Sequence, residues 1–297
     1  MLAEVIKALA PQAGGLYVDG TLGAGGHALG LLRAADGKIR LLGLDRDPSA
    51  LALAADTLAG HAVELQLGNF DEMAVTMQAL DMGPAQGVLL DLGVSSMQLD
   101  QAERGFSFMK DAPLDMRMGD KGPTAAQLIA QSGESELAAI IKKYGEEPYA
   151  RSIARKLARQ RVETTGQLAK LVEESLPAKE RRRRNIHPAT LVFQALRIAL
   201  NDELGALGRF LEQIPRLLAK GGRLAVISYH SLEDRLVKQA FVAYANSCTC
   251  PPGLPVCVCG SQALFKIVNR RPQVATDSEV AANPRARSAK LRVLEAL

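Results

Sequence analysis

The chain has 297 residues, of which 47% are hydrophobic and 23% are charged, and its formal net charge is +4. No apolar run approaches the roughly 18 residues that a membrane span needs, so we expect no membrane protein. The first residues include Glu4 and lack a basic segment followed by an apolar one, which argues against a secretory signal. We therefore expect a cytoplasmic protein whose four cysteines form no disulfides.

The first hundred residues alternate between strand and helix patterns. Short apolar runs predict four strands, at 16–18, 39–44, 63–67 and 87–90. Helical patterns lie between them at 27–35, 48–59 and 72–80, and Asp47 followed by Pro48 suits the start of the second helix. This alternation favours a parallel, doubly wound sheet.

A glycine-rich turn follows the first predicted strand. Four glycines between positions 20 and 26 crowd this turn, and glycines let backbone N–H groups approach a ligand closely. Asp45, at the end of the second predicted strand, can accept hydrogen bonds from ribose hydroxyls. The turn therefore predicts a site for a nucleoside-containing cofactor. Because Gly23-x-Gly25-x-x-Ala28 also fits the dinucleotide fingerprint, an NAD-dependent oxidoreductase is the first alternative.

Acidic residues close three of the predicted strands. Asp19, Asp45 and Asp91 each stand at a carboxyl end, which is where ligands bind in an open parallel sheet. One such acid alone would suit a helix cap, but three at strand ends favour a shared site. Phe70, just after the third predicted strand, is placed either to stack on an adenine or to pack in the core.

The alternation stops between about 105 and 200, where the sequence predicts no strand. Helical patterns lie there at 124–129, 134–144, 148–160, 165–176 and 188–200. Alternation resumes with a helix at 204–218 that Gly221 and Gly222 end, a strand at 223–228, a helix at 232–244, and strands at 263–268 and 290–294. We thus predict an α/β domain of residues 1–105 and 200–297, interrupted after its fourth strand by an all-helical insertion of residues 106–199.

The positive charge is concentrated in the middle of the chain. Residues 110–200 hold 17 basic and 11 acidic residues, whereas the rest of the chain is slightly acidic. This pattern fits a nucleic-acid contact surface or a solvated helical surface. Arg151, Arg155 and Arg159 fall four apart, on one face of a predicted helix. The run Arg181, Arg182, Arg183 and Arg184 offers further phosphate contacts, unless it is an exposed flexible loop without a partner.

The chain resembles the MraW/RsmH family of bacterial 16S rRNA cytosine-N4 methyltransferases. The resemblance covers nearly the whole chain in the expected order. The matching segments are DGTLGAGGH at 19–27, LDRDP at 44–48, DLGVSSMQLD at 91–100, RGFSF at 104–108, PLDMRM at 113–118, HPAT at 187–190, FQALRI at 193–198, ISYHSLEDR at 227–235 and NPRARS at 283–288.

The resemblance implies a class I S-adenosylmethionine-dependent methyltransferase, with a Rossmann-like sheet and a helical insertion. It places Gly25, Gly26 and His27 against the methionine portion of this cofactor. It assigns Asp45 to the ribose hydroxyls. The remaining positions it implies are Phe70 and Asp91 beside the adenine and Gln98 closing the pocket.

The activity implied is methylation of the N4 amine of a decoding-centre (P-site) cytosine. The partner is 16S rRNA within the small ribosomal subunit, with no membrane involved. Because the sulfonium is already an activated electrophile, we expect direct in-line transfer without a covalent intermediate. The catalytic residue is unknown, and the candidates are Ser95, Ser96, Tyr229 and His230. Tyr229 and His230 are placed to shape the base pocket or to receive a proton, and His230 equally suits a capping or core position.

Two features depart from the family pattern. The His-x-Pro-Val element expected before Leu2 is absent, which suggests a misassigned start or a truncated chain. Cys248, Cys250, Cys257 and Cys259 form two C-x-C pairs whose spacing is narrow for a structural zinc site, so we favour no metal. A non-enzymatic RNA-binding or assembly factor with the same fold is the remaining alternative.

Overall fold

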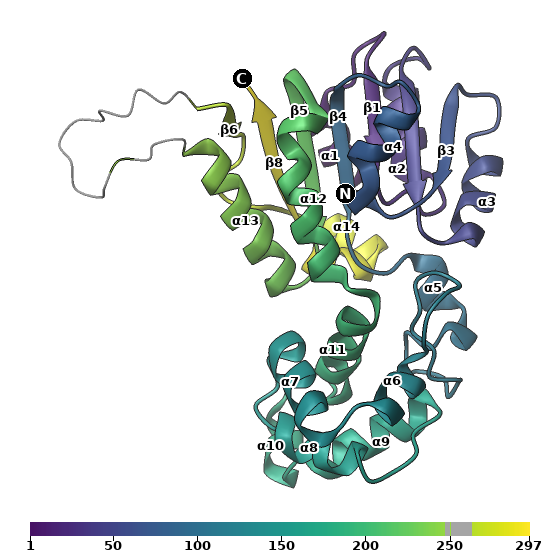
Figure 1. The fold of residues 1–297 in the computed structure, drawn as a ribbon, viewed down its shortest axis with the longest axis vertical. Coiled ribbons are helices and arrows are strands. Elements are labelled where there is room, and N and C mark those ends of the chain that lie inside the picture. Colours follow the sequence, from purple (N-terminus) through teal and green to yellow (C-terminus); the bar gives the residue numbers. More distant parts are fainter. Residues whose placement is uncertain (247–249, 251–262) are drawn as a thin grey trace. The chain divides into compact units, whose positions relative to one another are not determined.

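The computed structural model describes residues 1–246, 250 and 263–297, and they form two compact units. Unit 1 comprises Met1–Gly93 together with Leu204–Leu297, and unit 2 comprises Val94–Glu203. In Figure 1 the two segments of unit 1 are coloured purple to blue and green to yellow, and unit 2 is the blue to teal helical part between them in the sequence. In the described part of the chain, no helix has both the length and the apolar character of a membrane span.

Unit 1 is built on one twisted sheet with the strand order β3-β2-β1-β4-β5-β8-β6, and β7 pairs with β8. The first five strands pair in parallel and β8 pairs antiparallel to β5. Their bounds are β1 Leu16–Asp19, β2 Arg40–Asp45, β3 Val63–Leu67, β4 Ala85–Asp91, β5 Leu218–Ser228, β6 Phe265–Ile267, β7 Gln273–Val274 and β8 Lys290–Ala296. The order reverses between β1 and β4, the switch point where doubly wound sheets bind ligands. This architecture confirms the predicted Rossmann-like class I sheet.

Helices cover both faces of this sheet. The strands bury alternate side chains on opposite faces, as the two-residue period of a strand requires. Val18, Leu42 and Leu90 face a core shared with α4, α12 and α13, whereas Tyr17 and Leu89 face a core shared with α1, α2 and α3. The helices are α1 Leu2–Leu9, α2 Gly26–Ala34, α3 Pro48–Thr57, α4 Met73–Ala79, α12 Glu203–Leu217, α13 Ser231–Ala245 and α14 Asp277–Ala282.

Unit 2 is helical, as predicted. All its residues are described, and they contain no strand beyond an isolated bridge between Pro113 and Thr164. Its core consists of apolar side chains such as Ile141, Ile153 and Leu168. The helices are α5 Ser96–Asp100, α6 Ala125–Gln131, α7 Glu134–Gly145, α8 Ala150–Leu157, α9 Thr165–Ser175, α10 Ala178–Arg183 and α11 Ala189–Asn201.

Unit 2 is longer than the predicted insertion of residues 106–199. Hydrogen bonds tie its first residues to the segment around Met116, whose backbone N–H donates to the carbonyl of Arg104. At the other end, the Asn201 side chain accepts from the N–H of Met118 and donates to the carbonyl of Met116. Hydrogen bonds between such distant residues cannot be predicted from apolar periodicity, which is why the boundaries differ.

Several elements differ from the sequence prediction. Helices α1, α5, α10 and α14 and the strand β7 were not predicted. The glycine pair expected to end a helix lies instead inside β5, where Gly221 has a φ of 76°. The pairing register between β4 and β5 shifts beside this glycine, since Ala85 pairs with Leu218 and Gly87 with Arg223. The pair therefore forms a bulge within a strand rather than a break before it.

Candidate functional site

Three acids lie at one edge of the unit 1 sheet. Asp19, Asp45 and Asp91 are the last residues of β1, β2 and β4, and these three strands are parallel neighbours. Asp19 pairs in register with Gly43 of β2 and with Leu89 of β4, so the three strands end at nearly the same level. The prediction that these acids share an edge is confirmed.

The glycine-rich turn after β1 runs beside these acids. Gly23 and Gly25 have φ values of 53° and 83°, in the left-handed region where a side chain is strained. A Cβ at Gly23 or Gly26 would have no other atom within 4 Å, so the turn leaves open space at these positions. Gly20 serves packing instead, because a Cβ there would lie 2.6 Å from the Leu90 side chain. The turn therefore presents bare backbone at the start of α2.

Asp45 links this turn to β2. Its Oδ2 accepts a hydrogen bond of 2.8 Å from the N–H of Gly23, and its Oδ1 accepts one of 2.9 Å from the N–H of Asp47. Burial raises the pKa of the Asp45 carboxyl, and the backbone N–H groups oppose this rise. Each oxygen keeps a lone pair that can accept from a hydroxyl. The assignment of Asp45 to a ribose is consistent with this arrangement and stays a prediction.

Asp19 is the most buried of the three acids, with 1% of its surface exposed. Its Oδ1 accepts from the N–H of Thr21 at 3.1 Å, whereas its Oδ2 is buried without a hydrogen-bond partner. Burial, together with the nearby Asp91 and Asp45, raises the pKa of Asp19 to about 7. A buried oxygen without a donor is costly, and a ligand that brings an N–H or a positive charge would relieve that cost.

Asp91 lies in a small polar cluster. The Tyr229 hydroxyl donates to its Oδ1 at 2.9 Å, and Nε2 of His27 lies 3.5 Å from its Oδ2. Its backbone N–H donates to the Thr21 hydroxyl at 2.6 Å. Burial raises the pKa of Asp91 and lowers the pKa of His27, and each of these residues opposes the shift of the other. Asp91 and His27, which the resemblance assigned to different parts of the cofactor, are therefore neighbours.

Tyr229 and His230 each have a hydrogen-bond partner within unit 1, and a role for either in receiving a proton stays a prediction. Burial first, and then the charge of Asp91, raise the pKa of the Tyr229 hydroxyl, which therefore remains a neutral donor. His230 is the N-cap of α13, and its Nδ1 accepts from the N–H of Glu233. The Glu233 carboxylate accepts in return from the N–H groups of Tyr229 and His230. Of the two interpretations of His230, the structure supports the capping one.

Phe70 has a packing role on at least one face. It is half-buried and packs edge-to-face on Phe210 of α12, with ring centroids 5.9 Å apart. The next residue, Asp71, accepts two hydrogen bonds from the Arg209 guanidinium, and Gln213 donates to its carbonyl. These contacts hold the segment after β3 against α12. Stacking of Phe70 on an adenine stays a prediction.

Ser95, Ser96 and Gln98 belong to unit 2, and two of them form a helix cap there. The Ser95 hydroxyl accepts from the N–H of Gln98, and the Gln98 side chain accepts in return from the N–H of Ser95. The Gln98 amide also donates to the carbonyl of Met118. Ser96 is exposed on the short helix that they cap. Their contacts give Ser95 and Gln98 a structural role, and a role beside the cofactor stays a prediction.

The arginines predicted to contact RNA divide into two groups. Arg184 forms a bidentate ion pair of 2.6 and 2.8 Å with Glu147, whose side chain is fully buried, so Arg184 stabilises unit 2. Arg155 lies 3.4 Å from Glu134 on the surface. Arg159 lies beyond the end of α8, so the expected single helical face does not include it.

Other members of the set remain exposed. Within the described residues no ion pair involves Arg151, Arg159, Arg181 or Arg182. Arg181, Arg182 and Arg183 form the last turn of α10, and the flexible-loop alternative for them is therefore wrong. A hollow of about 800 Å³ between α7 and the start of α8 is lined by Lys142 and Arg151, among others.

Of the four cysteines, the structure describes Cys250 alone. Cys248, Cys257 and Cys259 lie outside the described residues, and so does the weak zinc site considered for the four cysteines.

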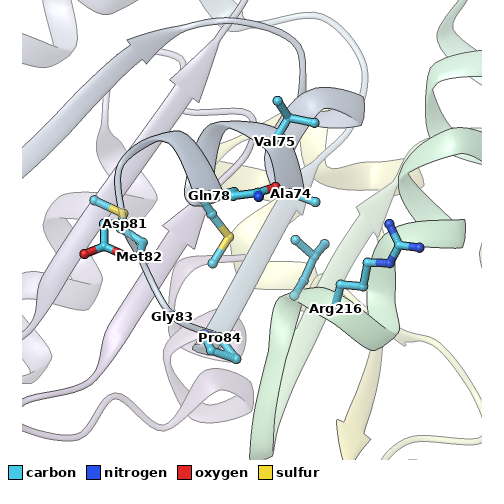
Figure 2. A pocket seen from close by; sticks show the side chains of 10 residues that line it. Ala74, Val75, Gln78, Asp81, Met82, Gly83, Pro84 and Arg216 are labelled. Atoms are coloured by element: carbon cyan, nitrogen blue, oxygen red, sulfur yellow. The ribbon is translucent and has the colours of Figure 1, made fainter.

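A further hollow in unit 1 lies away from the acids. It has a volume of about 330 Å³ and is lined by residues that precede β4 and β5, which places it at the amino ends of these strands. Figure 2 shows Arg216 on one side of it and Asp81 and Met82 on the other. None of the residues predicted to bind the cofactor line it.

Comparisons with known proteins decide between the alternatives for this site. A family model described as the MraW methylase family matches residues 1–297. The chain belongs to the MraW methylase family. It is 52% identical over 301 residues to "Ribosomal RNA small subunit methyltransferase H" of Symbiobacterium thermophilum, an alignment that covers 99% of this chain and 94% of that protein. The protein of the same name from Geobacter sulfurreducens is 54% identical over 304 residues, covering 100% and 97%.

Solved structures give a more distant match. An rRNA methylase from Streptococcus thermophilus aligns over 100% of this chain and 92% of its own, with 14% identity and a TM-score of 0.41.

Family membership confirms an S-adenosylmethionine-dependent methyltransferase and rules against the NAD-dependent oxidoreductase. The residues at the sheet edge fit this cofactor. The open glycine turn gives close backbone approach, Asp45 offers acceptors for hydroxyls, and the unpartnered oxygen of Asp19 suits an amino group.

Proposed function

We propose that this methylase transfers a methyl group from S-adenosylmethionine to the N4 amine of a cytosine in the decoding centre of small-subunit ribosomal RNA. Two observations support the proposal. Relatives that are about half identical over nearly their whole length are named ribosomal RNA small subunit methyltransferases. The sheet edge of unit 1 also carries the acids and the glycine turn that such a donor requires, and this geometry carries the proposal.

Residues of unit 1 hold the donor. Backbone groups at Gly25 and Gly26, where α2 begins, would hold its charged methionine end, and Asp45 would accept from its ribose hydroxyls. When bound, the sulfonium supplies an electrophilic methyl group. His27, Phe70 and Asp91 complete the set carried over from the family resemblance.

The chain's own contribution to the reaction is orientation and exclusion of water. The lone pair of a cytosine amine is delocalised into the ring, so the amine must be held in line with the methyl group. It must also donate an N–H to an acceptor, which favours the tetrahedral nitrogen. Asp91, half-buried at the end of β4, is ionisable and is a candidate for this acceptor. No side chain is required to attack covalently.

Unit 2 supplies the contacts to RNA. The exposed arginines Arg151, Arg159, Arg181 and Arg182 offer bidentate donors to phosphate oxygens. Lys142 and Arg151 line the hollow beside α8, which suits a nucleotide of the substrate. Arg184 is not part of this set, because its guanidinium is engaged by Glu147.

The proposal is tested by transfer of a labelled methyl group to small subunits from cells that lack this enzyme, and to the same RNA freed of protein. We expect one N4-methylcytidine, mapped by mass spectrometry, and much less label with Asp45→Ala when the donor is limiting. Label on another base or another atom would contradict the proposal. RNA binding without any transfer would favour the non-enzymatic assembly factor.

A further inference from the structure

We propose that Tyr229 is a positioning residue. By donating to one oxygen of Asp91, its hydroxyl orients this carboxylate so that the second oxygen, beside His27, accepts a hydrogen bond from an amino group of the methyl donor or of the substrate base. This inference rests on the proposed function only for the identity of the base. It explains why a tyrosine follows β5 at the edge where the acids of β1, β2 and β4 end.

The contacts of Asp91 leave little freedom to its carboxylate. Oδ1 receives the Tyr229 hydroxyl at 2.9 Å, and Oδ2 lies 3.5 Å from Nε2 of His27. The backbone N–H of Asp91 is held by the Thr21 hydroxyl at 2.6 Å. The two oxygens therefore have different neighbours, and the distance to His27 leaves room for Oδ2 to accept from another donor.

Tyr229 is itself fixed from two directions. Its backbone N–H donates to the buried Glu233 at 2.8 Å, which sets where the chain leaves β5. Its ring lies 3.6 Å from the position that a Cβ on Gly93 would occupy, and Gly93 has a φ of 95°. A hydroxyl on a ring held in this way places its proton at one point, which is what a positioning residue requires.

The charges that face Asp91 come from several elements. His27 of α2 and the amino group of Met1 favour its ionised form, whereas Glu233 of α13 and Asp19 of β1 disfavour it. The Tyr229 hydroxyl is the direct donor that stabilises the ionised form among these neighbours. Removing this hydroxyl should therefore raise the pKa of Asp91 and leave its carboxylate free to rotate.

The test compares Tyr229→Phe with Tyr244→Phe, a matched control whose hydroxyl donates to the carbonyl of Leu211 at 2.9 Å on the other face of the sheet. Two quantities are measured as a function of pH. The first is the dissociation constant of S-adenosylmethionine, by calorimetry, and the second is the single-turnover rate at saturating donor.

We expect Tyr229→Phe to lose about tenfold in one of these two measurements, and the decline of that quantity at acid pH should begin at a higher pH than in the wild type. A loss in donor binding identifies an amino group of the donor as the partner of Asp91. A loss in the single-turnover rate alone identifies the amino group of the substrate base as the partner of Asp91. The control should match the wild type in both measurements, while its melting temperature falls because the carbonyl of Leu211 loses this donor.

A double-substitution cycle with Asp91→Asn tests whether Tyr229 acts through Asp91. Tyr229→Phe should have no further effect in the Asp91→Asn background. A third readout needs neither donor nor RNA, since the NMR titration of His27 should shift in Tyr229→Phe and not in Tyr244→Phe. An unshifted His27 titration, or equal losses in the presence and absence of the Asp91 carboxylate, would overturn the inference. Failure of transfer by the wild type, with the His27 shift present, would instead count against the proposed function.

Discussion

The two units use charged residues in opposite ways. In unit 1 the acids predicted to form the site stand at strand ends, where Asp19 is buried and Asp45 and Asp91 are half-buried. Backbone N–H groups donate to Asp19 and Asp45. In unit 2 most of the arginines predicted to contact RNA are exposed, and the sheet has no part in placing them. The topology of the sheet thus determines where the acids lie. The role of each arginine depends instead on whether an acidic side chain pairs with it. Adjacent residues show the contrast, because Arg183 pairs on the surface with Glu180 and Arg184 with the buried Glu147.

The largest effect expected is on stability, from Arg184→Ala. This substitution leaves the Glu147 carboxylate buried without its partner, and the free energy of unfolding should fall by about 3 kcal/mol. Arg183→Ala is the matched control, since it breaks a surface pair worth less than about 0.5 kcal/mol. Chemical denaturation of both variants checks the difference. Equal losses in free energy of unfolding for the two variants would contradict the different roles of Arg183 and Arg184.

Asp45→Ala should weaken donor binding by about a hundredfold, because it removes the acceptor for the ribose and releases the N–H groups of Gly23 and Asp47. Asp45→Asn keeps one acceptor oxygen and should therefore lose less affinity for the donor. Calorimetry with S-adenosylmethionine measures both. Unchanged binding in Asp45→Ala would remove Asp45 from the donor site.

Asp19 should make stability depend on pH. Its pKa is about 7 in the folded chain and near 3.9 when unfolded, so the unfolded state releases its proton first. The free energy of unfolding of the wild type should therefore fall between about pH 4 and pH 7 and level off above. Asp19→Asn lacks this loss, so its stability relative to the wild type should be higher at pH 8 than at pH 4.

The control is Asp36→Asn, a substitution at an exposed acid. The difference in free energy of unfolding between this variant and the wild type should not change with pH. A constant difference between Asp19→Asn and the wild type across this range would contradict the burial argument.

The smallest effect should come from the exposed cations. Arg181→Ala combined with Arg182→Ala should weaken RNA binding about tenfold and reduce its salt dependence by about two phosphate contacts, with donor affinity unchanged. Lys38→Ala, an exposed cation of unit 1, is a charge-matched control. A fall in donor affinity with unchanged RNA binding would show that this turn of α10 is structural.

The sequence predicted the sheet and its acids because both follow from short-range patterns. An apolar run that ends in Asp91 is visible in the chain, and parallel strands end at one edge. The role of Arg184 was not predictable, because its partner Glu147 lies 37 residues earlier in the sequence. Gln98 was taken only for a pocket residue, although Ser95 three positions before it is the signature of a capping box. The helix-breaking interpretation of Gly221 failed because a glycine also serves a bulge.

The most direct test of this account is a crystal structure of the chain with S-adenosylmethionine bound. The account predicts the donor at the carboxyl ends of β1, β2 and β4, with its ribose on Asp45 and its amino group within reach of the free oxygen of Asp19. A donor bound elsewhere in unit 1, for example in the hollow beside Arg216, would contradict it.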